Sequence, residues 1–236
     1  VEIFPVLRAM LEKIQGASPY FSPTDMGVNM AGYCIFDDDA VKEAAEREIL
    51  RRYYQTAVAE KRCGSDGSQT QKMELMLNRA EIAPTVRPVI AAAAARAEVS
   101  GSPAGALELP DGDIVTGKTT TLLEATAALL LNALKRLAGI DQETDIISPQ
   151  ALEPICNLKV RHLHHKNPRL HADEVLIALS ISSTRNADAA KALEQLEKLR
   201  GCDAHYTVIL SRMDEKTHKA LGIYATSEPK YEVKPV

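Results

Sequence analysis

The stretch "PDGDIVTGKTTTLLEATAALLLNALKRLAG", residues 110–139, decides how the second half of the chain is interpreted. Its letters from Gly112 to Thr119 satisfy the phosphate-loop pattern G-x-x-x-x-G-K-[ST]. A working phosphate loop needs small or polar residues between its glycines, so that backbone amides can turn toward a phosphate. Ile114 and Val115 occupy that interval here, and β-branched residues favour an extended backbone. The stretch therefore has to be weighed as a strand as well as a loop.

A hairpin explains the same letters better. Pro110-Asp111-Gly112 lies between two segments in which apolar residues alternate, "ALELP" and "DIVTG". A turn of this composition between such segments predicts a β-hairpin. We interpret Gly112 as a turn residue, residues 113–116 as the return strand, and the phosphate-loop spelling as coincidental.

The apolar run that follows predicts a helix from Thr119 to Ala138, which Gly139 ends. Lys118 and a run of threonines stand where the strand leads into this helix. Free amides at a helix N-terminus, the helix dipole and a lysine make Lys118 and Thr119 a candidate anion-binding site. Ordinary capping of the helix by threonine explains these residues equally well.

The order of predicted elements indicates an α/β fold that borders on α+β. Residues 1–100 read as a helical segment, whose alanine-rich last helix at 84–99 would allow close approach of another helix. A break at "SGSPAG" separates this segment from residues 101–236, where strands alternate with helices. We expect a three-layer α/β domain there, with strands that include "TDIIS", "AHYTVIL" and "IYATS".

Composition narrows the classes of partner. Hydrophobic residues make up 45% of the chain, which is enough for a substantial core. An aromatic content of 4%, the absence of Trp and a net charge of −4 argue against a nucleic-acid partner. No uncharged apolar run reaches 18 residues, so no membrane partner is predicted. Four scattered cysteines without a C-x-x-C pair indicate reduced thiols and a cytoplasmic location.

A long irregular segment near the start offers a first candidate site. Residues 17–39 contain proline, glycine and several polar groups without a regular period. Long loops inside compact domains are often functional, although a plain connector between helices would look similar. We expect Asp25 to act as an acid–base or metal-bridging group there, and Ser22, Thr24 and Asn29 to bind ligand.

A basic segment offers the second candidate site. Lys166, Asn167, Arg169 and His171 crowd the run "KNPRLH", which suits a phosphate or carboxylate ligand, although a solvated basic loop is the plain alternative. The same region holds the histidine-rich letters "HLHH", residues 162–165. That spacing is not a standard ligand set, and H-E-x-x-H does not occur, so no metal site is predicted.

Several long blocks carry a family resemblance: "SPTDMGVNMAGYCI", "LELPDGDIVTGKTT" and "KNPRLHADEVLIALSIS". Over essentially the whole chain the sequence resembles the second half of the bacterial domain-of-unknown-function 1846 family. The resemblance implies a first half with a Gly-rich turn that would hold a nucleotide such as ATP. Since the chain opens at Val1 inside a helical pattern and lacks an initiator Met, we expect it to be the later part of a longer protein. Typical members carry Gly-Ser where this chain has His164-His165, which implies that these histidines are not family chemistry.

A more distant similarity bears on the fold. The run from "LELPDGDIV" through "ALEPI" is similar to small proteins with a cytidine-deaminase-like layout that lack the zinc ligands.

Together these observations predict a cytoplasmic bacterial protein that is the C-terminal half of a nucleotide-dependent enzyme acting on a small anionic metabolite. The alternative is a non-catalytic ligand-binding or oligomerisation domain, and a homo-oligomer is expected in either case. A third option is a metal-dependent hydrolase with zinc near residues 162–171.

Overall fold

The computed structural model describes residues 4–17 and 38–232. They form two compact units that divide between Arg87 and Pro88. Helix α4, Pro88–Ser100, therefore belongs with the second unit, although the sequence grouped it with the helical segment 1–100. Within the described ranges, no helix has both the length and the apolar character needed to cross a bilayer.

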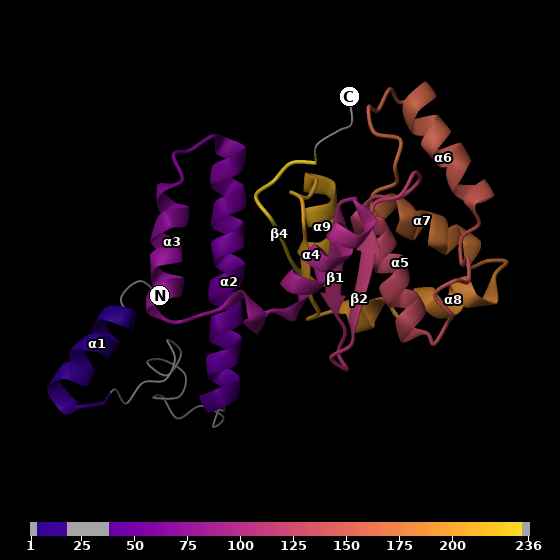
Figure 1. Ribbon diagram of the computed structural model, residues 1–236. Coiled ribbons are helices and arrows are strands. Elements are labelled where there is room, and N and C mark those ends of the chain that lie inside the picture. The colour runs from indigo at the N-terminus through magenta and orange to yellow at the C-terminus, as the bar shows by residue number, and fades with distance from the viewer. Residues whose placement is uncertain (1–3, 18–37, 233–236) are drawn as a thin grey trace. The chain divides into compact units, whose positions relative to one another are not determined.

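The first unit is helical. It contains α1 (Phe4–Gln15), α2 (Asp38–Cys63), α3 (Ser68–Arg79) and a 3-10 turn, η2 (Pro84–Val86). Helices α2 and α3 lie side by side (Figure 1). Between them they bury a small apolar cluster, Ile49 and Leu50 of α2 with Leu77 of α3, to which Ile82, just after α3, also belongs.

The second unit is built on a mixed sheet of four strands among the described residues. The strands are β1 (Ala104–Glu108), β2 (Ile114–Lys118), β3 (Asp203–Tyr206) and β4 (Tyr224–Ser227), in the order β2-β1-β3-β4. Strand β1 is antiparallel to β2 and β3, and β3 is parallel to β4. The carboxyl ends of β2, β3 and β4 therefore meet at one edge of the sheet.

The predicted hairpin is confirmed. Strands β1 and β2 pair from Glu108 opposite Ile114 to Ala104 opposite Lys118. Gly112 has φ of 86°, a conformation that glycine adopts without strain, and its amide donates to the Leu109 carbonyl over 2.9 Å. Because residues 114–118 form an extended ladder, they cannot wrap around a phosphate.

Helices cover both faces of the sheet, so the predicted three-layer arrangement is confirmed. On one face α4 packs through Val89 and Ala93 against Ala106 of β1. On the other lie α5 (Ala125–Leu137), α7 (Ala172–Ser182), α8 (Ala187–Leu193) and α9 (Arg212–Leu221), with α6 (Pro149–Arg161) and the 3-10 turn η3 (Leu196–Leu199) completing the unit. The cytidine-deaminase-like layout stays a prediction.

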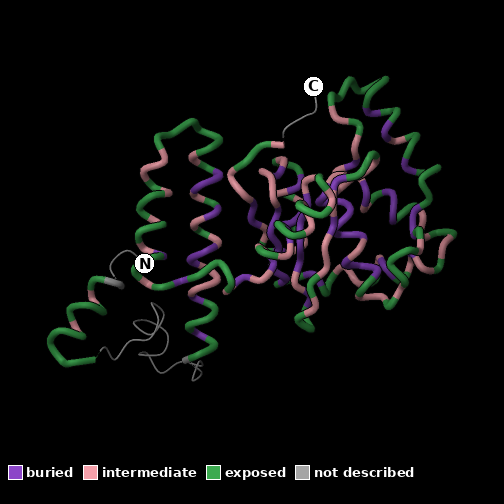
Figure 2. The backbone as a smooth tube through the Cα atoms, in the orientation of Figure 1, coloured by how far each residue is buried: buried purple, intermediate pink, exposed green. Residues whose placement is uncertain are grey.

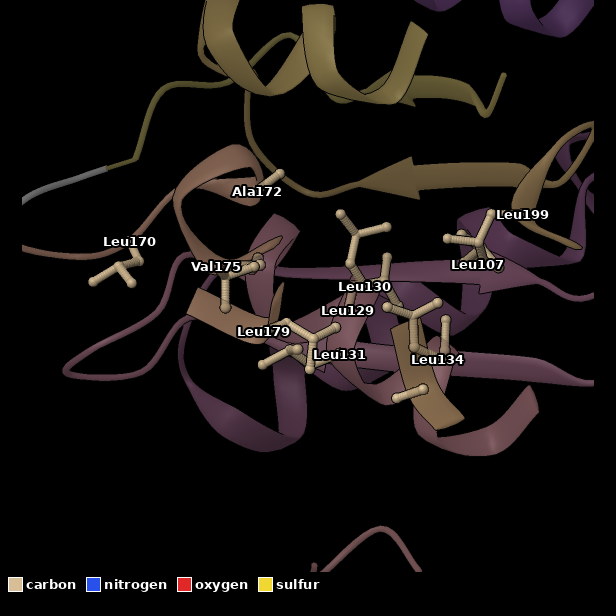
Figure 3. Packing of buried hydrophobic residues seen from close by; sticks show 14 of the residues in the cluster. Leu107, Leu129, Leu130, Leu131, Leu134, Leu170, Ala172, Val175, Leu179 and Leu199 are labelled. Atoms are coloured by element: carbon tan, nitrogen blue, oxygen red, sulfur yellow. The ribbon is translucent and has the colours of Figure 1, made fainter. Parts of the chain in front are cut away.

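The main core lies between the sheet and α5. Leu129, Leu130 and Leu134 of α5 pack with Leu107 of β1 and Leu179 of α7, and all five are fully buried (Figure 3). Figure 2 shows the buried residues concentrated in these strands and the helices beside them.

Two expectations for this unit are wrong. The helix predicted from Thr119 begins at Ala125, because Leu123 is held in a parallel bridge to Leu170 and the residues before it remain irregular. The segment "TDIIS" is not a strand; it buries Ile146 and Ile147 in the core without joining the sheet.

Candidate functional site

Residues 122–124 run beside Leu170 at the end of the sheet where β2, β3 and β4 have their carboxyl ends. The Leu170 amide donates to the Leu122 carbonyl over 2.8 Å, and the Glu124 amide donates to the Leu170 carbonyl over 3.0 Å. Leu170 is fully buried, while its neighbours Arg169 and His171 are partly exposed.

Asn167, Arg169 and His171 form what we call the polar row. The Asn167 side-chain amide donates to Glu124 Oε1 over 2.6 Å, and Arg169 Nη1 lies 3.7 Å from the same oxygen. Glu124 is the N-cap residue of α5. The polar row is thus tied to the start of α5, in the region outside the strand ends where α/β proteins commonly bind ligands.

A buried carboxylate, Asp214 of α9, organises this region. Its Oδ1 accepts hydrogen bonds from Thr126 Oγ1 and from the Ala172 amide, each over 2.9 Å. Its Oδ2 accepts from Ser211 Oγ over 2.6 Å and from His171 Nδ1 over 2.9 Å. One side chain therefore connects the first turns of α5, α7 and α9.

These bonds decide the charge of Asp214. Burial alone would raise the pKa of this carboxyl, because its side chain is only 4% exposed. The hydrogen bonds from His171, Ser211 and the Ala172 amide outweigh burial and lower the pKa to about 2. Asp214 is therefore ionised at neutral pH.

His171 is the partly exposed member of this pair, with 23% of its side chain accessible. The hydrogen bond to Asp214 raises the pKa of His171, against an opposing effect of burial. Because Asp214 is ionised and can only accept, Nδ1 carries the proton. In the neutral ring Nε2 is then the nitrogen that can accept a proton.

A buried lysine holds the backbone of the polar row. Lys159 of α6 is 2% exposed, and its ammonium group donates to the Arg169 carbonyl over 2.5 Å and to Glu174 Oε2 over 2.6 Å. The same Glu174 oxygen accepts from the His171 amide over 2.8 Å. The ion pair thus fixes the main chain on both sides of Leu170.

His218 of α9 and Tyr206 of β3 form a second buried pair, next to Asp214. His218 Nδ1 lies 2.8 Å from the Asp214 carbonyl, which can only accept, so Nδ1 carries the proton. His218 Nε2 then accepts from the Tyr206 hydroxyl over 2.6 Å. Burial lowers the pKa of His218 and raises that of Tyr206, so both side chains stay neutral at physiological pH.

Comparison with known families identifies the chain. Residues 1–81 match the family model described as domain of unknown function DUF1846, N-terminal, and residues 85–236 match DUF1846, C-terminal. The chain belongs to the DUF1846 family. The resemblance to the second half of the family is therefore confirmed in part, since the match takes in both family domains.

Relatives of this DUF1846 chain carry the name UPF0371 protein. One from Corynebacterium urealyticum is 52% identical over 231 residues, covering 98% of this chain and 46% of the relative. One from Streptococcus thermophilus is 51% identical over 232 residues, covering 98% and 47%. The chain spans about half the length of the curated relatives it matches.

The structure of the DUF1846 chain brings some of the predicted site residues together and not others. Asn167, Arg169 and His171 come together in the polar row, while Lys166 is exposed just before it. Lys118 ends β2 at the same edge of the sheet. Ser22, Thr24, Asp25 and Asn29 lie outside the described residues.

The placement predicted for Lys118 and Thr119 at a helix start is wrong. Helix α5 begins six residues after Thr119, and an acidic side chain, Glu124, stands at its N-cap. Thr119 itself is 6% exposed, and its amide donates to the Pro103 carbonyl over 2.8 Å. A role for these two residues in ligand binding stays a prediction.

In the part of the chain that the structure describes, the histidines of residues 162–165 do not cluster with other metal-ligating side chains. His162, His164 and His165 are exposed. No group of three or more His, Cys, Asp or Glu side chains suited to a metal is present among these residues.

Sequence reasoning missed Asp214, Thr126 and Lys159. Asp214 lies 43 residues from His171 in the sequence, so only the fold brings the two together. The letters Ser211 to Asp214 do carry a signal, because S-x-x-D before a helix predicts a capping box. That signal locates a helix start and says nothing about His171.

Proposed function

We propose that this chain carries the acid–base centre of an enzyme that acts on a small anionic molecule. The observation that supports this proposal is the bond between His171 Nδ1 and the buried Asp214, which makes Nε2 the nitrogen that exchanges a proton. A carboxylate in this position fixes the tautomer and the orientation of the ring, as in Asp–His pairs of hydrolases. His171 would then donate or accept a proton through Nε2.

His171 and Arg169 would supply the positive charge that an anionic ligand needs. The raised pKa of His171 increases the fraction of imidazolium near neutral pH. Arg169, which lies 2.7 Å from Glu232 and 3.7 Å from Glu124, adds a guanidinium two residues away, and planar guanidinium groups suit carboxylates and phosphates. Lys118 and Lys166 would add positive charge nearby.

A nucleotide would bind through other parts of a longer protein. The phosphate-loop spelling at residues 112–119 is a β-hairpin, which offers no cradle for phosphates. The relatives are about twice the length of this chain, so nucleotide dependence of the whole protein remains part of the proposal. The sequence-based role of Asp25 also remains a prediction.

The competing proposal, a non-catalytic oligomerisation domain, loses its main sequence argument. Ala93 of the alanine-rich helix α4 is fully buried against the sheet of its own unit. That face of α4 is therefore used within the unit. A ligand-binding domain without chemistry would share the polar row and is separated from the enzyme by the measurement that follows.

His171→Gln tests the proposal, with His162→Gln as the matched control on a neighbouring exposed histidine. A thermal-shift screen of carboxylated and phosphorylated metabolites on the full chain should first yield a stabilising ligand. We expect turnover of that ligand, followed by NMR, to fall about 10²- to 10⁴-fold in His171→Gln, the usual contribution of general acid–base catalysis.

His162→Gln should turn the ligand over at the wild-type rate. Equal turnover in His171→Gln would contradict the assignment of His171. Binding of a ligand without turnover in any variant would favour the non-catalytic ligand-binding domain.

A further inference from the structure

We propose that Arg169 binds the carboxylate of a small ligand, and that Glu232 occupies this position when no ligand is bound. The inference rests on the proposed function and adds the chemical class of the ligand and an internal competitor. The side chain of Glu232 would act as a built-in substitute for the ligand carboxylate.

The ion pair between Arg169 and Glu232 is the first observation. Arg169 Nη1 lies 2.7 Å from Glu232 Oε1, a charge-assisted hydrogen bond. Both side chains are about one-quarter exposed, at 27% and 25%. Solvent can therefore reach the pair from outside.

The path of the chain after β4 is the second observation. The Glu228 amide donates to the Tyr206 carbonyl over 2.8 Å, and the Lys230 carbonyl accepts from the Ile209 amide over 2.8 Å. Residues 228–232, which we call the strap, have no regular secondary structure and pass the carboxyl end of β3. The strap places a carboxylate on the one arginine of the polar row.

The surroundings of Arg169 explain why a ligand could replace Glu232. Arg169 and His171 flank the buried Leu170 in the sequence and both are partly exposed, and in the proposal one small carboxylate bonds both of them. Glu232 bonds only Arg169 of these two. In the imidazolium form of His171, Nε2–H can donate to a ligand carboxylate, which is a bond that the strap lacks.

The end of the strap can leave Arg169 while the sheet stays intact. Lys230 is the last residue of the strap with a described backbone hydrogen bond to another element, so residues 231 and 232 can move without breaking the sheet. Because the competitor belongs to the chain, it lowers the apparent affinity for ligand by the fraction of molecules in which Arg169 is free. Removing the carboxylate of Glu232 should therefore strengthen ligand binding.

Glu232→Gln in the full chain is the test, with Glu194→Gln, an exposed glutamate of the same unit, as the matched control. The probe is malonate, a small dicarboxylate, and inorganic phosphate is titrated in parallel. NMR signals of the His171 ring and of amides 169–171 report binding. We expect malonate to bind Glu232→Gln about 3- to 10-fold more tightly than the wild type, with Glu194→Gln unchanged.

Arg169→Gln should lose malonate binding. Arg169→Lys, which keeps the charge and loses the planar fork, should weaken it, and this variant provides the readout if Arg169→Gln does not fold. Equal affinity of Glu232→Gln and wild type, undetectable malonate binding in Glu232→Gln, or tighter binding of phosphate than of malonate would each overturn the proposal.

These outcomes are separate from those that test the acid–base role of His171. Unaltered turnover in His171→Gln would remove the proposed function while leaving the displacement of Glu232 by malonate intact.

Discussion

Replacement of Asp214 with Ala is expected to lower the free energy of unfolding by about 3–5 kcal/mol, the usual cost of removing one partner from a buried ionic network. The reason is that four groups lose their common acceptor: the hydroxyls of Thr126 and Ser211, the Ala172 amide and His171 Nδ1. Urea denaturation of the full chain, with hydrogen exchange to locate the loss in α5, α7 and α9, would measure it.

The control is Asp188→Ala, which removes an exposed carboxylate from the first turn of α8. We expect it to cost less than about 1 kcal/mol. A loss of similar size in both variants would show that the Asp214 bonds are not special to the fold.

The same network gives stability a pH dependence. The pKa of Asp214 is lowered from 3.8 to about 2 in the folded protein. The contribution of this carboxylate to the free energy of unfolding is therefore fully present above pH 4 and is lost as the pH falls through 2. That shift corresponds to roughly 2 kcal/mol. The pKa of His171 is raised, so its contribution is present below pH 6.5 and is lost as the pH rises through the folded pKa. Because the two shifts share one hydrogen bond, they do not add.

Replacement of Gly117 with Ala is expected to cost about 3 kcal/mol, at the upper end for overpacking by a single methyl group. A Cβ atom at Gly117 would lie 2.3 Å from the Leu129 backbone nitrogen and 2.5 Å from its Cα. Since these are main-chain atoms, α5 has to move away from β2 as a whole. Urea denaturation, with hydrogen exchange in β2 and α5, would report the loss.

Two controls separate steric overlap from other effects of adding a methyl group. Gly112→Ala meets no atom within 4 Å and pays only for its positive φ, about 1–2 kcal/mol. Leu129→Ala cannot rescue Gly117→Ala, because the clash is with the backbone. Rescue by Leu129→Ala would contradict the described packing of α5 on β2.

The sequence was sufficient for features that depend on neighbouring residues. Pro110-Asp111-Gly112 between alternating segments predicted the hairpin, because turn chemistry and strand periodicity are local properties. The run "KNPRLH" also placed Asn167, Arg169 and His171 together in one short segment.

Features that depend on distant residues could not be predicted in this way. The threonines at 119–121 look like helix caps, but the bridge from Leu123 to Leu170 keeps this segment out of the helix. Asp214 meets His171 only after α7 and α9 have packed together. No local signal in the sequence pairs those two residues.

The pKa of His171, measured by NMR on the ring carbon in the wild type and in Asp214→Asn, tests the proposed acid–base centre most directly. We predict a value above 6.5 in the wild type, because Nδ1 bonds an ionised carboxylate, and a clearly lower value in Asp214→Asn. A wild-type value at or below 6.5, or the same value in both proteins, would contradict the pairing on which the proposed site depends.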